Sequence, residues 1–367
     1  MRTLRTILNG QFVLGVMLAV TAQSAQQAAD MPRIDNANLE TRSVTGSLDA
    51  TFRELAAKAD KQEWIGYSVD QIPSEHNACC GNYHDDGSCG TCKLENDRDG
   101  VSGTTQKSGT VKLEGARQLV VLLRLEAKQV VKIRVASQNC TLDAGGLPLV
   151  WLTGVKPAES VALLETYVRG ASFEGHGDHG LGNGALTAIA LHADASADRA
   201  LESFVAPEQK DALRRQAAFW MGVARGKAGL NTLLRMAKSD PSSDVRAQVA
   251  FALYVSHEPG AINEMIRMAH DDASSHVRGQ TLFWLAQKAG QKAVGTITGA
   301  IENDPDTEVK KKAVFALSQL PREEGVPKLI EVVQTNRNPE VRKQAMFWLG
   351  QSNDPRALDF FEKVLTQ

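Results

Sequence analysis

The chain has 367 residues, which is enough for two domains or for one domain followed by a repeat array. Its 41 basic and 43 acidic residues nearly balance, which argues against a global field for nucleic acid or an anionic membrane. Aromatic residues make up only 5 % of the chain, so their positions carry more information than their number.

The first residues have the pattern of an export signal. Two arginines precede the apolar run Phe12–Val20, and small residues follow it. That run is too short to span a bilayer, which needs about 20 apolar residues. We therefore expect a signal peptide over residues 1–25, with a buried helix as the alternative, and a polar lead-in over residues 26–46. No later segment is apolar enough to span a membrane, so a soluble periplasmic or secreted protein is expected.

Residues 47–169 are predicted to form a small α+β domain. Residues 118–126 and 129–137 alternate between apolar and polar side chains and are separated by two residues, which predicts a β-hairpin. The other predicted elements of this domain are a helix over 48–60, strands over 64–69 and 149–152, and a helix over 158–169.

Cysteines are confined to this predicted domain: Cys79, Cys80, Cys89, Cys92 and Cys140. An exported chain meets an oxidising compartment, where such a cysteine-rich loop is normally closed by disulfides. Four neighbouring cysteines allow three pairings, so the connectivity is open. Two alternatives remain: a thiol-redox Cys-x-x-Cys motif, and a zinc site drawn from His76, His84, Cys89 and Cys92.

The glycine-rich residues 170–184 are interpreted as a linker. Residues 185–367 are predicted to form an α-solenoid, because one segment recurs five times with a step of 32 residues. A basic residue marks each unit at Arg214, Arg246, Arg278, Lys310 and Arg342. A phenylalanine marks each unit at Phe219, Phe251, Phe283, Phe315 and Phe347.

Each unit is predicted to contain two helices, the first of which carries the shared segment. Asp240-Pro241, Asp304-Pro305 and Asn338-Pro339 stand just before first helices, where a capping side chain followed by proline starts a helix. Residues 185–206 are expected to form a degenerate, more polar opening repeat.

The pattern Asp-Pro-x-x-x-Val-Arg-x-x-Ala-x-x-Ala-Leu resembles HEAT repeats of the phycobilisome-lyase-like type, over roughly residues 185–367. The resemblance implies a right-handed α-solenoid of the kind used mainly as a scaffold. It also implies that the basic residues join Asp side chains in a ladder between repeats. The enzymatic branches do not carry over, because the paired His-Glu motifs of deoxyhypusine hydroxylases do not occur in this array.

The phenylalanines lie nearly opposite the buried stripe of each first helix, because successive residues turn by about 100°. One interpretation is that each ring is buried against the next repeat. The other is an aromatic ladder on the concave surface that binds a partner, flanked by Gln216, Gln248, Gln280 and Gln344. The alternating neighbours Trp220, Ala252, Trp284, Ala316 and Trp348 are interpreted as core packing between repeats.

Two functions follow as hypotheses. The first is an exported, non-catalytic scaffold, without a cofactor, that binds a protein or peptide on the solenoid and does not bind nucleic acid. The second is a metal-binding or thiol-redox protein, or an accessory to an enzyme, with its chemistry in the Cys79–Cys92 loop. No catalytic residue is predicted in the array, which has no nucleophile–base pair, phosphate loop or paired carboxylates at useful spacing.

Overall fold

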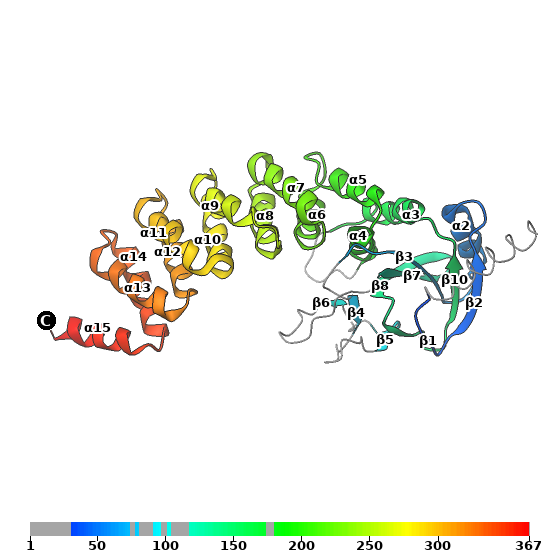
Figure 1. Cartoon of the computed structure of the whole chain (residues 1–367), viewed down its shortest axis with the longest axis horizontal. Helices are drawn as coiled ribbons and strands as arrows, with labels where there is room; N and C mark the ends of the chain where they lie inside the picture. Colours follow the sequence, from blue (N-terminus) through cyan, green and yellow to red (C-terminus); the bar gives the residue numbers. More distant parts are fainter. Residues whose placement is uncertain are drawn as a thin grey trace, which may run out of the picture. The chain divides into compact units, whose positions relative to one another are not determined.

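The computed structural model describes residues 31–73, 91–96, 117–173 and 180–366 in full, and the backbone of residues 78–80 and 101–103. The predicted signal peptide and the residues His76, His84 and Cys89 lie outside the described residues. The chain divides into two compact units, residues 1–200 and 201–367. The first is α+β and the second is helical, as the sequence predicted (Figure 1).

A five-stranded mixed sheet forms the centre of the first unit. In spatial order its strands are β2 (Asn38–Ser43), β10 (Pro148–Thr153), β3 (Glu63–Asp70), β7 (Gln118–Glu126) and β8 (Gln129–Ser137). The first three run parallel, and β3, β7 and β8 pair antiparallel. The predicted hairpin is therefore present, and residues from the expected polar lead-in add an edge strand.

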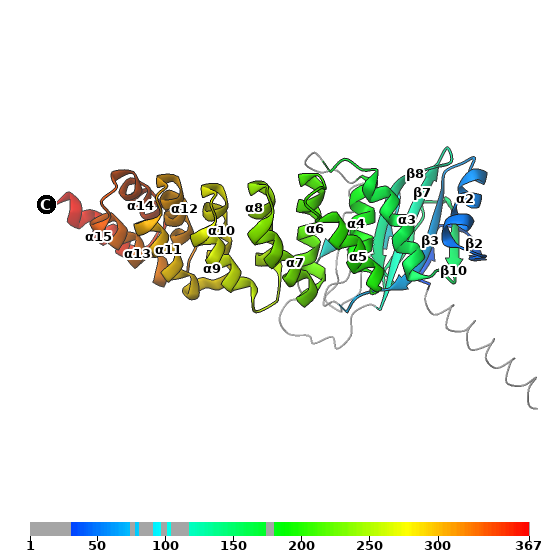
Figure 2. The ribbon, with the colours of Figure 1, turned by 90° about the horizontal axis from the view of Figure 1, so that it is seen from above.

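Helices cover one face of this sheet and a smaller sheet covers the other. The helices are α2 (Leu48–Lys58), α3 (Pro157–Arg169) and α4 (Leu181–Leu191), which lie beside the sheet in Figure 2. The smaller sheet has the order β1 (Ile34–Asp35), β9 (Thr141–Asp143) and β5 (Thr91–Lys93). A two-stranded sheet pairs β4 (Ala78–Cys80) with β6 (Val101–Gly103).

Successive side chains of a strand point to opposite faces of the sheet. The strands therefore supply apolar side chains both to the core beneath the helices and to the core beneath the smaller sheet. Trp64 and Trp151 belong to a cluster that also holds residues of the smaller sheet. Gly66 pairs with Trp151 across the two strands, and a Cβ there would stand 2.9 Å from Leu122 and 3.0 Å from the Trp151 ring. A glycine is therefore required at this position if the Trp151 ring is to pack against β3.

A buried polar network on the helix side joins three elements of the first unit. The hydroxyl groups of Tyr67 and Ser160 lie 2.8 Å apart, and Ser160 Oγ is 2.9 Å from His192 Nε2. His192 Nδ1 is 2.6 Å from the carbonyl oxygen of Ala188, so both of its ring nitrogens have partners. Burial raises the pKa of the Tyr67 hydroxyl, which stays neutral. The network holds α3 and the end of α4 against β3.

The second unit consists of five helix pairs that match the predicted repeats. The first helices are α6 (Asp211–Ala224), α8 (Ser243–Val255), α10 (Ser275–Ala289), α12 (Thr307–Ser318) and α14 (Pro339–Gln351). The second helices are α7 (Gly226–Ser239), α9 (Ala261–Asp271), α11 (Val294–Asn303), α13 (Arg322–Thr335) and α15 (Pro355–Leu365). A short 3₁₀ turn, η1 (Gly290–Ala293), precedes α11. Helix α5 (Ala195–Phe204) contains the boundary between the units.

The first helices form one layer of the array and the second helices form the other (Figure 2). Successive first helices contact one another far more extensively than successive second helices do. The layer of first helices is therefore the shorter one, on the inner side of the array's curve. Among the described residues, the helices are too short or too polar for any of them to cross a membrane.

Two details differ from the sequence interpretation. Helix α4, expected in the linker and the opening repeat, packs on α3 and β8 of the first unit. Of the three predicted caps, only Asn338 caps its helix, by accepting from the Glu340 amide. Asp240 and Asp304 stand two residues earlier than the cap, because Ser242 and Asp306 occupy the cap positions.

Candidate binding surface

Three of the five marker basic residues form an Arg–Asp ladder, whereas Lys310 and Arg342 donate to backbone carbonyl oxygens. Arg246 Nε and Nη2 donate to the two carboxylate oxygens of Asp272, at 2.8 and 2.9 Å. Its Nη1 also donates to the carbonyl oxygen of Asp240 in the preceding loop, at 2.8 Å. The same pairs occur between Arg214 and Asp240 and between Arg278 and Asp304. The ladder that the resemblance implied for five basic residues is therefore present at three of them, and these three arginines are occupied by contacts between repeats.

Burial and pairing act in opposite directions on these groups. Burial alone would raise the pKa of Asp272, but hydrogen bonds from Arg246 and the Ser274 amide lower it overall. The hydrogen bonds that Arg246 donates to Asp272 raise the pKa of Arg246 in turn. A paired charge of this kind is a structural feature rather than a docking point for an external anion.

The five marker phenylalanines lie in one row on the first helices. Phe219 and Phe251 stack with ring centroids 5.9 Å apart and planes 9° apart. Phe283 and Phe315 stack at 5.7 Å with planes 2° apart. Offset stacking at such distances stabilises each pair by about 0.5–1.5 kcal/mol beyond its apolar burial.

Tryptophans join the two phenylalanine stacks into one continuous aromatic row. Trp284 lies 4.7 Å from Phe251 and also 4.7 Å from Phe283, measured between ring centroids. Trp348 lies 4.8 Å from Phe315 and 4.9 Å from Phe347. We name this surface the aromatic row: Phe219, Trp220, Phe251, Tyr254, Trp284, Phe283, Phe315, Trp348 and Phe347.

The solvent exposure of the phenylalanines lies between the two interpretations, which were burial against the next repeat and exposure on the concave surface. The first four rings pack against a neighbouring repeat and remain partly exposed, and Phe347 is 53 % exposed. The tryptophans, interpreted as core from the sequence, are half-buried as well. Fully buried Ala252 and Ala316 leave the room in which Trp284 and Trp348 reach the phenylalanines. The aromatic row is therefore an apolar surface that is partly exposed to solvent.

The predicted glutamines border this row. Each stands three residues before its phenylalanine and hence on the same side of its helix. Gln216 and Gln280 are exposed, and Gln248 and Gln344 are half-buried. In the fourth repeat the same position is occupied by Lys312. Amide groups beside aromatic rings supply hydrogen bonds in the pattern that protein interfaces use.

One hollow of about 300 Å³ opens on the aromatic row between the third and fourth repeats. It is lined by Gly279, Gln280, Phe283, Lys312 and Phe315. Sequence reasoning missed Gly279 and Lys312. Their signal lies in the repeat alignment, where each departs from the side chain that neighbouring repeats carry.

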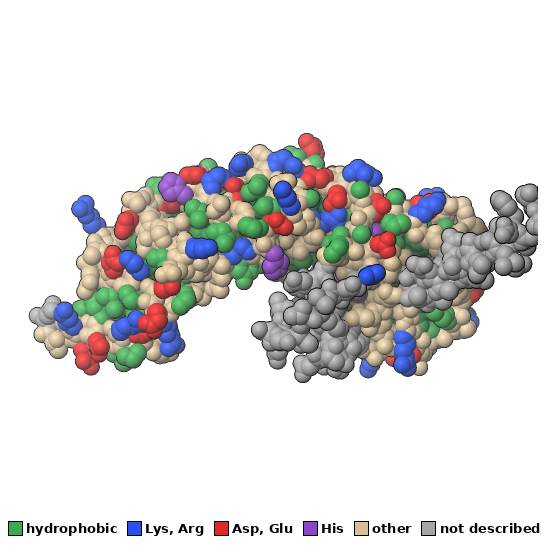
Figure 3. Space-filling model, viewed as in Figure 1, with side chains coloured by type: hydrophobic (Ala, Val, Ile, Leu, Met, Phe, Trp, Pro, Cys, Tyr) green, Lys and Arg blue, Asp and Glu red, His purple; other side chains and the backbone are tan. Residues whose placement is uncertain are grey.

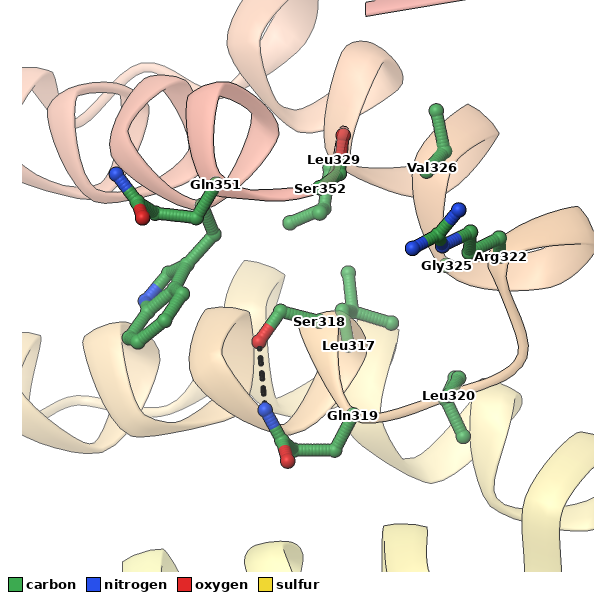
Figure 4. Close-up of a pocket in the computed structure, with 11 residues that line it drawn as sticks. Leu317, Ser318, Gln319, Leu320, Arg322, Gly325, Val326, Leu329, Gln351 and Ser352 are labelled. Carbon is green, nitrogen blue, oxygen red and sulfur yellow. Dashed lines mark hydrogen bonds between the residues drawn. The ribbon is translucent and has the colours of Figure 1, made fainter. Parts of the chain in front are cut away.

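A second hollow, of about 240 Å³, lies at the helix ends of the fourth and fifth repeats. Leu317 of α12, Arg322 of α13 and Ser352, the residue that follows α14, surround it (Figure 4). Its edge carries a hydrogen bond of 3.1 Å from Gln319 Nε2 to Ser318 Oγ. Trp348 also lines it, and this indole nitrogen is buried without a hydrogen-bond partner in the described part of the chain.

Lys288 stabilises the inner layer beside the aromatic row. Its Nζ donates to the carbonyl oxygens of Tyr254 and Ser256, at 2.7 and 2.6 Å, where α8 ends. Burial lowers the pKa of the Lys288 ammonium group. This cation satisfies helix-end carbonyls and is occupied by that structural contact.

The structure describes the side chains of two of the five cysteines, Cys92 and Cys140. Strand β4 contains Cys79 and Cys80, whose side chains lie outside the described residues, as does all of Cys89. Cys92 and Cys140 are both buried in the cluster between the two sheets. Of the alternative zinc ligands only Cys92 is described, and the described residues contain no group of three or more His, Cys, Asp or Glu arranged to hold a metal ion.

Comparison with known families identifies the array. Residues 199–286 and 294–367 match the family described as HEAT repeats. The second unit is therefore a HEAT-repeat solenoid, as its 32-residue period and its pattern predicted. Among curated proteins, no sequence matches this chain.

Solved structures with a similar fold include human deoxyhypusine hydroxylase in complex with glycerol. It has 14 % identity, covers 56 % of this chain and 90 % of its own, and gives a TM-score of 0.30. The complex of CpcE and CpcF of phycocyanin lyase from Nostoc sp. PCC7120 has 18 % identity, coverages of 57 % and 81 %, and a TM-score of 0.29. Kap95p, known from a structure with RanGDP, has 15 % identity, coverages of 57 % and 32 %, and a TM-score of 0.37. At these scores the similarities carry no argument about function.

Proposed function

We propose that this HEAT-repeat array is a non-catalytic scaffold that binds an extended polypeptide along its aromatic row. The observation that carries the proposal is the continuity of partly exposed rings through five repeats. Packed helices lie about 8–10 Å apart, so four steps give a surface about 32–40 Å long. An extended chain rises about 3.3 Å per residue, so about 11 residues span that surface.

Charge favours a polypeptide over a nucleic acid as the partner. Three of the marker arginines are bound to Asp side chains, and basic and acidic side chains are mixed on the visible face of the array (Figure 3). Nucleic-acid affinity depends on several free cations that neutralise phosphates. The aromatic row with bordering amides instead suits apolar side chains on a chain whose backbone needs hydrogen bonds.

Export and disulfide bonds belong to the same proposal. The basic, apolar and small-residue pattern of residues 1–25 supports export. Cys92 is fully buried, which supports closure of the Cys79–Cys92 loop by disulfides rather than a reactive thiol pair. We infer that these disulfides stabilise the first unit and take no part in binding.

Selection of peptides tests the binding proposal. A library of random 12-residue peptides is displayed and selected on the full-length protein, and affinities are measured by fluorescence anisotropy. Selected peptides are expected to lose at least tenfold in affinity for Phe283→Ser, because truncation of an aromatic anchor costs about 2 kcal/mol or more. The matched control is Leu358→Ser, which removes a 65 % exposed apolar side chain from the layer of second helices. It is expected to leave the affinity of the selected peptides unchanged.

Measuring the free energy of unfolding shows whether the Phe283→Ser variant is still folded when its affinity is compared. Phe283 is only half-buried, so Phe283→Ser is expected to cost less than about 2 kcal/mol in free energy of unfolding. The proposal fails if no peptides are enriched, or if enriched peptides bind the folded Phe283→Ser variant as tightly as the original protein.

A further inference from the structure

The hollow between the third and fourth repeats has an apolar floor and one cation. Its floor is the parallel stack of Phe283 and Phe315. Gly279 leaves the space above α10 open, and the Lys312 side chain crosses that space. A Cβ on Gly279 would collide with Cδ of Lys312 and would stand 3.3 Å from its Nζ. The ammonium group is thereby held beside the aromatic rings.

Lys312 differs from the two lysines that precede it. Lys310 donates to the carbonyl oxygen of Glu302 at 2.8 Å, and Lys311 pairs with Glu308 at 2.9 Å. Lys312 has no hydrogen bond or ion pair with the described residues, and Glu308, one turn away, is already engaged. The Lys312 charge is therefore available to an anion from outside the chain.

The combination occurs at one junction between repeats only. At the position of Gly279 the other repeats carry Arg215, Ala247, Lys311 and Lys343. At the position of Lys312 they carry Gln216, Gln248, Gln280 and Gln344. The missing side chain in the third repeat and the extra cation in the fourth meet at one junction, so this junction has a specificity that the others lack.

We propose that this hollow binds an aromatic side chain of the partner polypeptide together with the carboxylate of an adjacent Asp or Glu. This inference rests on the proposed function and names the partner's anchor. The ring packs on Phe283 and Phe315, the carboxylate pairs with Lys312 Nζ, and the Gln280 amide donates a second hydrogen bond. At about 300 Å³ the hollow is at the lower end of the volumes of small-molecule pockets, which suits one side chain and its neighbour.

Dipeptide probes test this anchor directly. N-acetyl-4-fluorophenylalanyl-aspartic acid amide and its asparagine counterpart have the same shape and differ by one charge. Their affinities for the full-length protein are measured by ¹⁹F NMR titration. The aspartate probe is expected to bind about threefold more tightly, as a partly exposed ion pair allows. The preference is expected to shrink in 0.5 M NaCl, as the Debye length falls to roughly 4 Å.

Variants separate Lys312 from its neighbours. Lys312→Gln is expected to abolish the preference for aspartate while both probes still bind. Lys311→Gln is the matched control and is expected to keep the preference, since Lys311 is paired with Glu308. Gly279→Ala is expected to displace Lys312 and weaken both probes. Circular dichroism verifies that each variant is folded.

The outcomes distinguish this inference from the proposed function. Equal affinity of the two probes for the original protein overturns the acidic anchor, as does an equal effect of Lys311→Gln and Lys312→Gln. If selected 12-residue peptides still require Phe283 in that case, the peptide-binding function stands and only the anchor is wrong. If neither the probes nor the selected peptides bind, the proposed function itself fails.

Discussion

Asp272 makes the stability of the array depend on pH. Its carboxylate accepts both Arg246 bonds and the Ser274 amide, and its pKa is lowered although burial opposes ionisation. A carboxyl group whose folded pKa lies below its unfolded value of about 3.9 stabilises the fold above pH 4. That stabilisation is lost as the pH falls through the lower, folded pKa.

Asp272→Asn should therefore destabilise the array by about 3 kcal/mol at pH 7, because it leaves the partly buried Arg246 without its counter-charge. The difference between the original protein and the variant should narrow as the pH falls below about 4. Urea unfolding followed by circular dichroism from pH 7 to pH 3 measures both effects. Asp271→Asn, at the exposed neighbouring residue, should show neither. A gap that stays constant over this range would disprove the linkage.

Several single residues lay beyond what the sequence could predict. The hairpin from residue 118 to 137 followed from alternation, yet its turn places Ala127 and Lys128 at φ values of 49° and 66°. Neither residue is typical of that turn, where Asn-Gly is usual, so strand pairing imposes the conformation. Asp240 was expected to cap a helix and instead binds Arg214, because only the folded array brings the two together across 26 residues.

At the scale of elements, one junction of the ladder is incomplete. The first three junctions each hold an Arg–Asp pair, whereas the corresponding positions at the next junction are Lys310 and Asn336. Lys310 donates to a backbone carbonyl instead, and Asn336 Oδ1 accepts from the Asn338 amide at 2.9 Å. The contact between α12 and the loop before α14 therefore has no charged pair at the position where the preceding junctions have one.

Completing this junction should stabilise the last two repeats. Lys310→Arg and Asn336→Asp together should show a favourable coupling energy of about 1–2 kcal/mol relative to the two single changes. Urea unfolding of the four proteins in a double-mutant cycle measures it. Pairing Lys310→Arg with Gln334→Glu, at an exposed position on α13, is the control and should give a coupling near zero. A coupling as small in the test pair as in the control would contradict the ladder's role at this junction.

Element types could be predicted where periodicity is strong, and the reasons are physical. The array repeats a buried stripe of Val, Ala and Leu every 32 residues, and helices of that kind bury the same face in every unit. Strand β2 was missed because five of its six residues are polar or charged and it lies exposed at the sheet edge, where pairing with β10 decides its structure. The candidate site was half-predicted: the phenylalanine and glutamine columns are visible in sequence, but ring stacking through the tryptophans is not.

At the scale of the whole molecule, the chain is two compact units with different sources of stability. All five cysteines belong to the first unit, and the array has none. The array is held by contacts between neighbouring repeats, so its stability is close to a sum of local interface terms. The first unit contains long-range pairings such as that of β5 with β9, which join segments far apart in the chain.

Reduction of the disulfides should consequently destabilise the first unit and leave the stability of the array unchanged. A disulfide typically contributes about 2–4 kcal/mol, so its reduction should speed exchange of the most protected amides by roughly 30- to 1000-fold. Hydrogen-exchange mass spectrometry with and without a phosphine reductant measures this, peptide by peptide. Peptides that contain β5, β9 and β10 should lose protection, because Cys92 lies on β5 in the core shared by these strands. Peptides from α8 to α14 should exchange at unchanged rates. Faster exchange in the array, or none in the first unit, would show that the disulfides have a different role from the one inferred.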